Sequence, residues 1–164
     1  MLSFDGRATR LDIGVVDVVV LAPAPAGRRD RWRVLTLRRA ANTRCSGAWE
    51  IVHGRIEGAE RPGDAALREV REETGLQVER LYGVRVHPFY LPPLDTVQMA
   101  LVFAAVVARS PVVLGAEHDA YVWRTPATSV KYLAWPTERE SVQHAVQLLA
   151  GGDAGAVEDV LRVR

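Results

Sequence analysis

The segment from Asp64 to Gly75 constrains the fold more than any other part of the sequence. Asp64 suits the N-cap of a helix, and Gly75 suits the residue that stops one. At helical spacing, one side of this segment carries the apolar stripe Ala66, Leu67, Val70 and Thr74. The stripe predicts a helix that packs one face against a core.

Three glutamates lie beside that stripe. At about 100° per residue, Glu69, Glu72 and Glu73 fall within an arc of roughly 100°. Like charges at these spacings cost about 0.2–0.5 kcal/mol per pair. A hard divalent cation would reverse that cost, because oxygen ligands suit Mg²⁺ or Mn²⁺. Taken alone, the carboxylates are explained at least as well by a solvated acidic face balanced by Arg68 and Arg71.

Segments of β type flank this helix on both sides. The predicted strands are Gly14–Ala22, Trp32–Leu37, Trp49–Val52, Leu81–Val86, Val97–Val107 and Ala120–Trp123. A Pro/Gly/Arg loop joins the first two strands over Pro23–Asp30, and an aromatic and proline loop covers His87–Leu94. One or two helical turns over Pro126–Leu133 and a second long helix over Thr137–Leu149 follow.

This order of strands, helix, strands and helix predicts an α+β sandwich rather than a regular βαβ series. The first strand is not followed by G-x-G-x-x-G, which argues against a doubly wound dinucleotide-binding fold. The 164 residues show no internal repeat and no dividing linker, so we expect one domain over 1–164. Gly151 to Asp153 break the last helix, and 150–164 is then a tail that forms a final turn or packs loosely.

Composition excludes several classes of protein. The formal net charge of +1 gives no global field toward nucleic acid or membrane, so we expect no stable nucleic-acid complex. The longest apolar run, Val18–Ala26, is too short to span a bilayer and contains two prolines. Met1–Asp12 lacks a signal pattern, and the single cysteine, Cys45, fits a reducing compartment. We therefore expect a cytoplasmic protein without a membrane anchor.

The spacing of the whole segment from Gly54 to Leu76 helps to decide between a metal site and a solvated acidic face for the three glutamates. Its key positions are Gly54, Glu60, Arg68, Glu69, Val70, Glu72, Glu73, Gly75 and Leu76. They resemble the Nudix box, G-x5-E-x7-R-E-U-x-E-E-x-G-U with U an aliphatic residue, and they match it without a gap. With each fixed residue at about 7% frequency, a chance match is on the order of 10⁻⁸ per starting point. The resemblance therefore favours a metal site over a solvated face.

The resemblance implies a Nudix-type α/β/α sandwich with a mixed sheet and a loop–helix–loop catalytic element. It implies that Glu69, Glu72 and Glu73 bind Mg²⁺, with Mn²⁺ able to substitute, and that a backbone carbonyl near Gly54 adds a ligand. Glu60 and Arg68 would pair to fix the loop against the helix. The metal would activate a water for in-line attack on a pyrophosphate bond of a nucleoside diphosphate derivative. One departure is His53, where many members carry glycine, and we interpret it as a tolerated loop residue rather than a catalyst.

A second segment refines the branch within the family. Residues 117–123 resemble a stretch of nucleoside triphosphate and dihydroneopterin triphosphate pyrophosphohydrolases, and 135–139 fit the same group. The resemblance makes Glu117 a candidate metal ligand or general base, with an exposed loop acid as the alternative. A hydrolase of ADP-ribose or another nucleoside diphosphate sugar is the competing branch, which Pro92 supports only weakly. A nucleotide-sensing module without activity is the alternative from another class, and a homodimer is possible within the family.

Four further residues are candidates for substrate contact. Arg38 and Arg44 belong to an early basic run that otherwise reads as solvated strand edges and loops. Phe89 and Tyr90 offer flat faces for a base, although aromatic side chains more often serve packing. The substrate is expected to be a small nucleotide.

Overall fold

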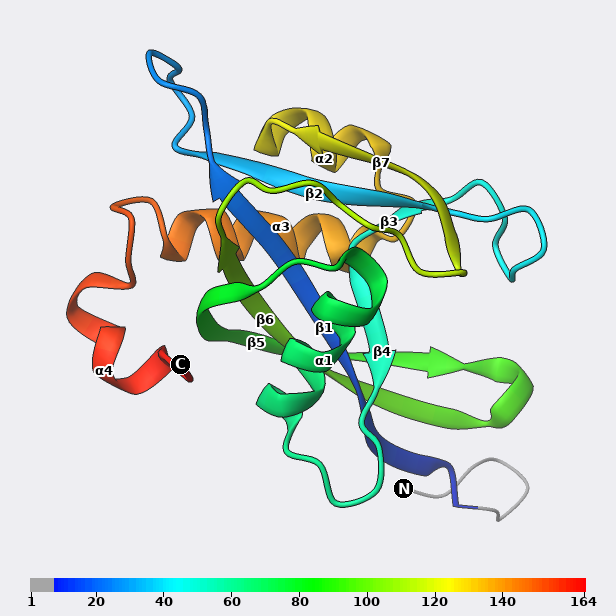
Figure 1. The fold of residues 1–164 in the computed structure, drawn as a ribbon. Helices are drawn as coiled ribbons and strands as arrows, with labels where there is room; N and C mark the ends of the chain where they lie inside the picture. The colour runs from blue at the N-terminus through cyan, green and yellow to red at the C-terminus, as the bar shows by residue number, and fades with distance from the viewer. Residues whose placement is uncertain (1–7) are drawn as a thin grey trace.

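The computed structural model describes residues 8–164, and within this range the strands form one sheet (Figure 1). The strands are β1 (Arg10–Pro23), β2 (Trp32–Arg39), β3 (Trp49–Glu50), β4 (Val52–Arg55), β5 (Val78–Leu91), β6 (Thr96–Val107) and β7 (His118–Arg124). The helices are α1 (Pro62–Thr74), α2 (Pro126–Tyr132), α3 (Pro136–Leu148) and α4 (Glu158–Leu161), with short 3₁₀ turns η1 (Pro92–Leu94) and η2 (Gly155–Val157).

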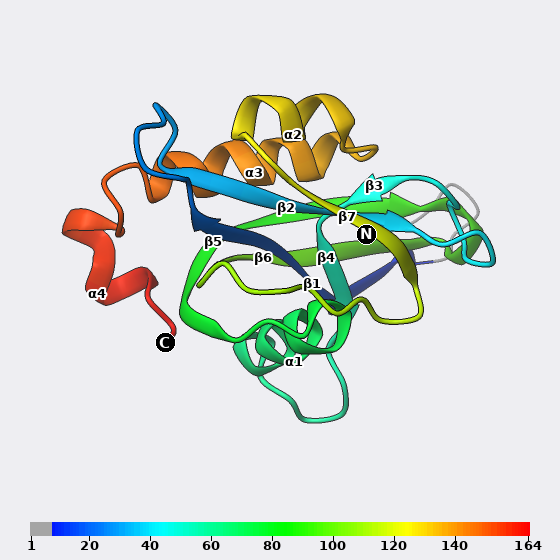
Figure 2. The same ribbon diagram turned by 45° about the horizontal axis from the view of Figure 1, so that its top comes forward.

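The sheet is mixed and has a helix layer on each face. Its order is β3-β2-β1-β6-β5, with β4 paired to β1 and β7 paired to β2. The central pair β1 and β6 is parallel, whereas the other pairs are antiparallel. Figure 2 shows α1 below the sheet and α2 and α3 above it. This arrangement confirms the predicted α/β/α sandwich.

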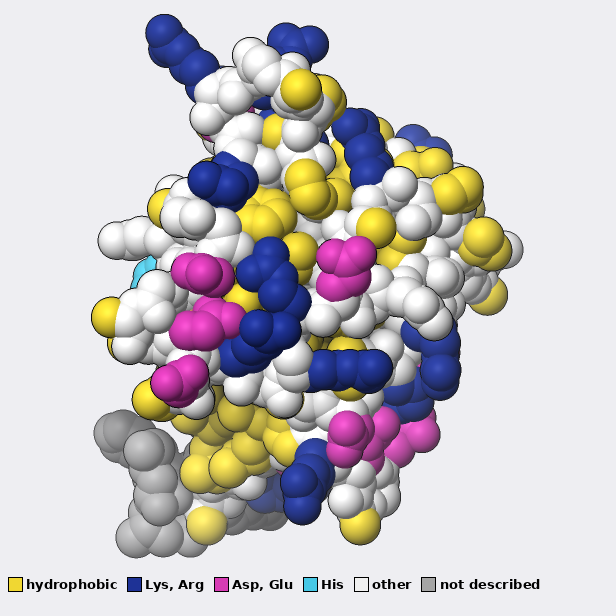
Figure 3. All heavy atoms as spheres, turned by 60° about the vertical axis from the view of Figure 1, so that its left-hand side comes forward, with side chains coloured by type: hydrophobic (Ala, Val, Ile, Leu, Met, Phe, Trp, Pro, Cys, Tyr) yellow, Lys and Arg dark blue, Asp and Glu magenta, His cyan; other side chains and the backbone are white. Residues whose placement is uncertain are grey.

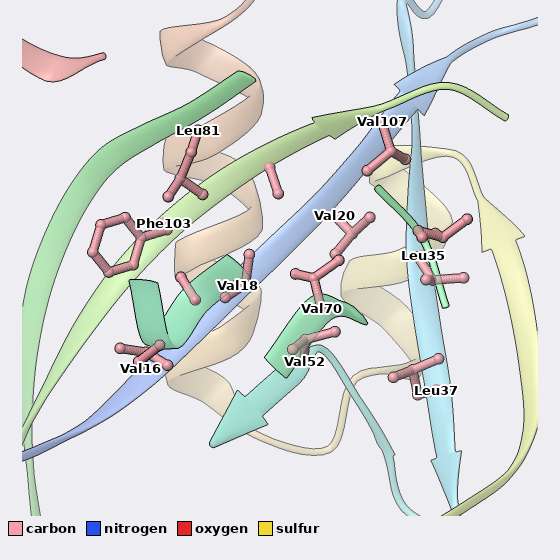
Figure 4. Close-up of a cluster of buried hydrophobic side chains, with 14 of the residues drawn as sticks. Val16, Val18, Val20, Leu35, Leu37, Val52, Val70, Leu81, Phe103 and Val107 are labelled. Atoms are coloured by element: carbon pink, nitrogen blue, oxygen red, sulfur yellow. The ribbon is translucent and has the colours of Figure 1, made fainter. Parts of the chain in front are cut away.

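Strand β1 is buried on both faces from Val15 to Ala22, as a central strand flanked by helices must be. Val16, Val18 and Val20 point toward α1 and pack with Val70 of that helix (Figure 4). Val19 and Leu21 alternate with them and join a second apolar cluster under α3. The two clusters fix the helices to opposite faces of one strand, so β1 sets the relative position of every layer.

Helix α1 begins earlier than the sequence predicted. Arg61 occupies the cap position with extended backbone and no side-chain cap, and Pro62 opens the first turn. Asp64 is therefore not the N-cap; it is an exposed acid within the first turn. Proline suits this start because its φ is preset and its missing N–H would have no helical partner. The predicted stop is confirmed, because Gly75 has φ 69° and donates its N–H to the carbonyl of Arg71.

The predicted loop over His87–Leu94 is wrong for most of its length. Strand β5 continues to Leu91 and pairs with β6 to the end, and only the turn Pro92–Leu94 lies outside it. Pro88 is tolerated because β5 is the last strand in the sheet order, where a missing N–H can face away from the ladder. The segment therefore forms a long hairpin rather than a loop.

The C-terminal segment packs along the outer edge of β5. Val163 donates its backbone N–H to the carbonyl of Leu81, and Arg162 pairs with Tyr82 in an isolated antiparallel β-bridge. The hydroxyl of Tyr82 donates to Glu158 at 3.0 Å. The tail thus covers an edge that would otherwise expose unpaired backbone groups.

The face that carries this tail has a mixed surface charge. Figure 3 shows basic and acidic side chains interspersed on it, with apolar side chains between them. No helix among the described residues is both long enough and apolar enough to cross a membrane.

Replacing Val70 tests how tightly α1 packs on the sheet. Val70 is fully buried, so Val70→Ala should lower the free energy of unfolding by about 2 kcal/mol through lost burial and a residual cavity. Chemical denaturation measures the change. The matched control is Val160→Ala, because Val160 is 82% exposed and should contribute almost nothing. Equal effects of the two variants would contradict the packing described here.

Candidate active site

The contact between α1 and β4 explains why residue 54 is a glycine. A Cβ built on Gly54 would lie 1.9 Å from the Cδ of Glu69. This distance is much shorter than a van der Waals contact, so any side chain at this position would displace the side chain of Glu69. Gly54 pairs with Val16 in the sheet, which prevents the strand from moving aside. The missing side chain at position 54 therefore makes room for the Glu69 carboxylate.

Arg68 holds the preceding loop against the helix. Its Nε and Nη2 each lie 3.0 Å from an oxygen of Glu60, which is a bidentate ion pair. Nη2 also donates to the backbone carbonyl of Arg55 at 2.7 Å. Glu60 in turn accepts the backbone N–H of Glu57 at 3.2 Å. One guanidinium thus ties together the end of β4, the loop and the helix.

The same guanidinium reaches two of the three helix glutamates. Nη1 of Arg68 lies 2.7 Å from Glu69 and 3.2 Å from Glu72. These pairs draw the two carboxylates toward Arg68, and the side chain of Glu72 remains 56% exposed. In this arrangement, no group of three or more acidic, His or Cys side chains in the described part of the chain is already gathered to hold a metal ion.

Glu73 lies in a different environment from its neighbours. It is buried, and its Oε2 has no hydrogen-bond partner. Burial, together with the nearby Glu69 and Glu50, raises its pKa to about 9. Nδ1 of His118 lies 3.9 Å from this oxygen, and that nitrogen also lacks a partner. An orphaned carboxylate oxygen among other carboxylates is a position that a divalent cation fits, because the cation would offset both the burial and the repulsion.

Glu117 lies beyond this buried acid, just before β7. Its side chain is 63% exposed, and its Oε2 lies 3.3 Å from Arg39. Arg39 also binds the buried Glu50 at 3.1 Å, and Glu50 accepts a hydrogen bond from Nε2 of His118 at 2.8 Å. Glu117 therefore stands at the outer end of a chain of charged groups that leads inward to Glu73.

A cavity of about 640 Å³ opens next to Gly54, and His53 and Arg55 on either side of that glycine line it. Strands β1, β5 and β6 form its floor, and the first residues of α3 and the loop after β2 form its walls. Its volume is within the range of small-molecule sites. No residue of α1 lines the cavity, but Glu50 and His53 do, and both lie close enough to Glu73 to affect its pKa.

Three of the four predicted substrate contacts line this cavity. They are Arg44, Phe89 and Tyr90. Arg38 does not line it, because its side chain lies near the ring of Trp49 and pairs with Asp119 at 2.7 Å. Its neighbour Arg39 takes that place. A register shift in the pairing of β2 with β7 falls between these two arginines, so simple alternation could not assign their faces.

Sequence reasoning missed the buried polar groups of the cavity. Asp17 interrupts the apolar run of β1 and receives hydrogen bonds from His53 and His87. Burial alone would raise the pKa of Asp17, but these two bonds hold it below its ordinary value. Glu138 on α3 is fully enclosed, and burial raises its pKa well above the usual range. The sequence did carry one signal, because Asp17 stands within a run of valines and a buried charge there requires polar partners.

Gly54→Ala tests the contact with Glu69. The added Cβ should lower the free energy of unfolding by about 1–3 kcal/mol, since the Glu69 side chain must move out of its place and away from Arg68. Gly151→Ala is the control, because its Cβ would meet nothing within 4 Å. Adding Glu69→Ala to the Gly54→Ala chain should recover part of the loss, as neighbouring substitutions couple. Strictly additive losses, measured by denaturation, would rule out the proposed contact.

Comparison with known proteins places this geometry in a family. The family model of the NUDIX domain matches residues 15–145. An octanoyltransferase of Myxococcus xanthus is 37% identical over 122 residues, which are 73% of this chain and 34% of that protein. An RNA pyrophosphohydrolase of Cereibacter sphaeroides is 44% identical over 50 residues, 28% of this chain and 31% of that protein. The chain thus spans about a third of the length of these relatives.

A solved structure of similar fold is the dihydroneopterin triphosphate pyrophosphohydrolase of E. coli. Its TM-score is 0.64 at 24% identity, with 84% of this chain and 96% of that chain covered. The family model covers most of the sandwich, including the glycine, the arginine and the glutamates that meet at α1. The chain therefore belongs to the Nudix family.

Proposed function

We propose that this protein hydrolyses a phosphoanhydride bond of a nucleoside triphosphate or of dihydroneopterin triphosphate, with release of pyrophosphate and a monophosphate. The observation that carries the proposal is the orphaned, buried Oε2 of Glu73, which lies among other carboxylates beside a ligand-sized cavity. A buried acid without partners lowers the stability of the fold, so its presence here points to a functional role.

Mg²⁺, or Mn²⁺ in its place, fits the donor atoms at this end of α1. The residues that would hold it are Glu69, Glu72 and Glu73, with the carbonyl near Gly54 and with Glu117 as a further candidate ligand or base. These donors are all oxygen atoms, which hard cations prefer. Bound there, the ion supplies charge neutralisation at the phosphates and a more acidic water.

The residues of the chain supply the positioning. Arg68 pairs with both Glu69 and Glu72, which holds their two carboxylates together on one side of α1. Arg39 and Arg44 line the same cavity and provide cationic contacts for the phosphates of a substrate. Fixed charges of this kind act without reorganisation during the reaction.

Activity should depend on the metal and on Glu73. A chelator should abolish turnover, and added Mg²⁺ or Mn²⁺ should restore it. Glu73→Gln keeps the shape and removes the negative charge that the side chain would carry with the cation bound, so kcat should fall by at least about 10²-fold. Glu79→Gln is the matched control, because Glu79 is exposed and lies outside the cavity. Full activity without metal, or unchanged turnover in Glu73→Gln, would overturn the proposal.

The reaction products distinguish the proposed hydrolysis of triphosphates from hydrolysis of ADP-ribose or another nucleoside diphosphate sugar. A panel of triphosphates and ADP-ribose is assayed with Mg²⁺, and released pyrophosphate is scored against released monophosphates. We expect a triphosphate to be the best substrate and pyrophosphate to be its product. ADP-ribose cleaved far faster than every triphosphate would assign the protein to hydrolysis of nucleoside diphosphate sugars instead.

Phe89 and Tyr90 should differ in their effect on substrate binding. Phe89 lies beside His87 on the cavity floor, with ring centroids 5.9 Å apart, whereas the hydroxyl of Tyr90 is bound to Asp95 at the exposed end of the hairpin. If the base stacks on Phe89, Phe89→Ala should raise KM roughly tenfold or more with little change in kcat. Tyr90→Ala should raise KM less. An unchanged KM with a lowered melting temperature in Phe89→Ala would assign the ring to packing.

A further inference from the structure

The buried polar atoms that lack partners are all near the candidate site. Within residues 8–164 they are Oε2 of Glu73, Nδ1 of His118, Nδ1 of His87 and Oε1 of Gln98. The first two face each other at 3.9 Å and belong to the carboxylate cluster of α1. The other two belong to residues that line the cavity floor, on β5 and β6. Buried orphan atoms on a cavity wall are what a bound ligand would satisfy.

The side-chain atom of Gln98 that lacks a hydrogen-bond partner must be its amide oxygen. Its other amide atom lies 3.0 Å from Oδ2 of Asp12. A carboxylate can only accept, so the amide nitrogen must face Asp12 and the oxygen must face away. Gln98 is buried, at 8% exposure, and therefore cannot turn its oxygen to bulk water. Asp12 thus fixes a hydrogen-bond acceptor on the cavity wall.

His87 provides a second unpartnered hydrogen-bond acceptor, by the same reasoning. Its Nε2 lies 2.9 Å from the carboxylate of Asp17 and therefore carries a proton. In the neutral ring, Nδ1 is then an acceptor, and it has no partner. The side chain is 3% exposed, so this nitrogen is also withheld from bulk water.

The two residues share one face of the sheet. Gln98 lies directly opposite Phe89 in the β5–β6 pair, and His87 is two residues before Phe89. Residues two apart on a strand, and residues opposite each other on neighbouring strands, point the same way. Phe89 therefore lies between the two residues that carry the unpartnered atoms. The cavity floor combines a flat apolar surface with hydrogen-bond acceptors at its edge.

We infer that this floor recognises the amino-oxo edge of a guanine or pterin ring, in which a ring N–H and an exocyclic amino group stand side by side as donors. The two donors of this edge match the two unpartnered acceptors at Gln98 and His87, which lie on the same face of the sheet, and Asp12 fixes the amide of Gln98. Adenine, cytosine and uracil do not present two such adjacent donor groups. The inference rests on the proposed function, because it names the substrate class of the same site.

Comparing GTP with ITP isolates the amino group, which is the only difference between them. We expect kcat/KM for ITP to be roughly tenfold to a hundredfold lower, because one buried acceptor is left unpaired. Dihydroneopterin triphosphate carries the same edge and forms the second arm, so the better of the two substrates distinguishes guanine from pterin. Equal kcat/KM for GTP and ITP, with dihydroneopterin triphosphate no better than ATP, would overturn the inference.

Variants of the floor should change this selectivity rather than the chemistry. Gln98→Met keeps the length of the side chain and removes the acceptor, so the ratio of GTP to ITP should fall toward one. Asp12→Asn keeps the volume and leaves the orientation of the Gln98 amide unfixed, so it should also reduce the ratio. Gln143→Met is the matched control, because Gln143 is exposed on α3 and does not line the cavity. An unchanged ratio in a folded Asp12→Asn variant would contradict the inference.

A binding measurement separates this inference from the proposed reaction. Calorimetry in the presence of a chelator compares GMP with IMP on the unmodified protein and needs no turnover. Tighter binding of GMP by roughly tenfold supports recognition of the amino group even if no triphosphate is cleaved. Cleavage of all triphosphates at similar kcat/KM, with equal binding of GMP and IMP, would keep the proposed function and reject the inference.

Discussion

The architecture of the site depends on the guanidinium of Arg68. It joins the carboxylate of Glu60 and the carbonyl of Arg55, and so holds the loop to the helix. It also binds Glu69, whose carboxylate occupies the space left by the missing side chain of Gly54. Strand, loop and helix are thereby fixed at one point. The buried face of α1 then anchors this point to the sheet through Val70 and the valines of β1.

The second constraint is the cost of burying charge in a central strand. Asp17 is enclosed in β1, where an unpaired carboxylate would be strongly destabilising. Two histidines from β4 and β5 offset that cost, and both line the cavity. On this face of β1, the apolar residues after Asp17 pack against α3, whereas Arg10 and Asp12 before it line the open cavity.

Periodicity predicted the elements and their order, because burial on one face leaves a pattern in the residues that carry it, whereas the α/β/α layers followed from the resemblance to the Nudix family. The same local patterns failed where a residue's place depended on distant partners. The strand through Pro88 is possible only because β5 lies at an edge, and the faces of Arg38 and Arg39 depend on a shift in register. The role of Gln98 follows from Asp12, which is 86 positions away in the chain. Spacing alone cannot reveal such pairs.

If the carboxylates of α1 bind a divalent cation, Mn²⁺ should bind to the protein even in the absence of any nucleotide. Titration with Mn²⁺, followed by its electron paramagnetic resonance signal, measures this binding directly. We expect saturable binding that Mg²⁺ displaces and that Glu73→Gln weakens by at least about tenfold, while Glu79→Gln leaves it unchanged. Identical Mn²⁺ binding by the unmodified protein and by Glu73→Gln would rule out a cation site at Glu73.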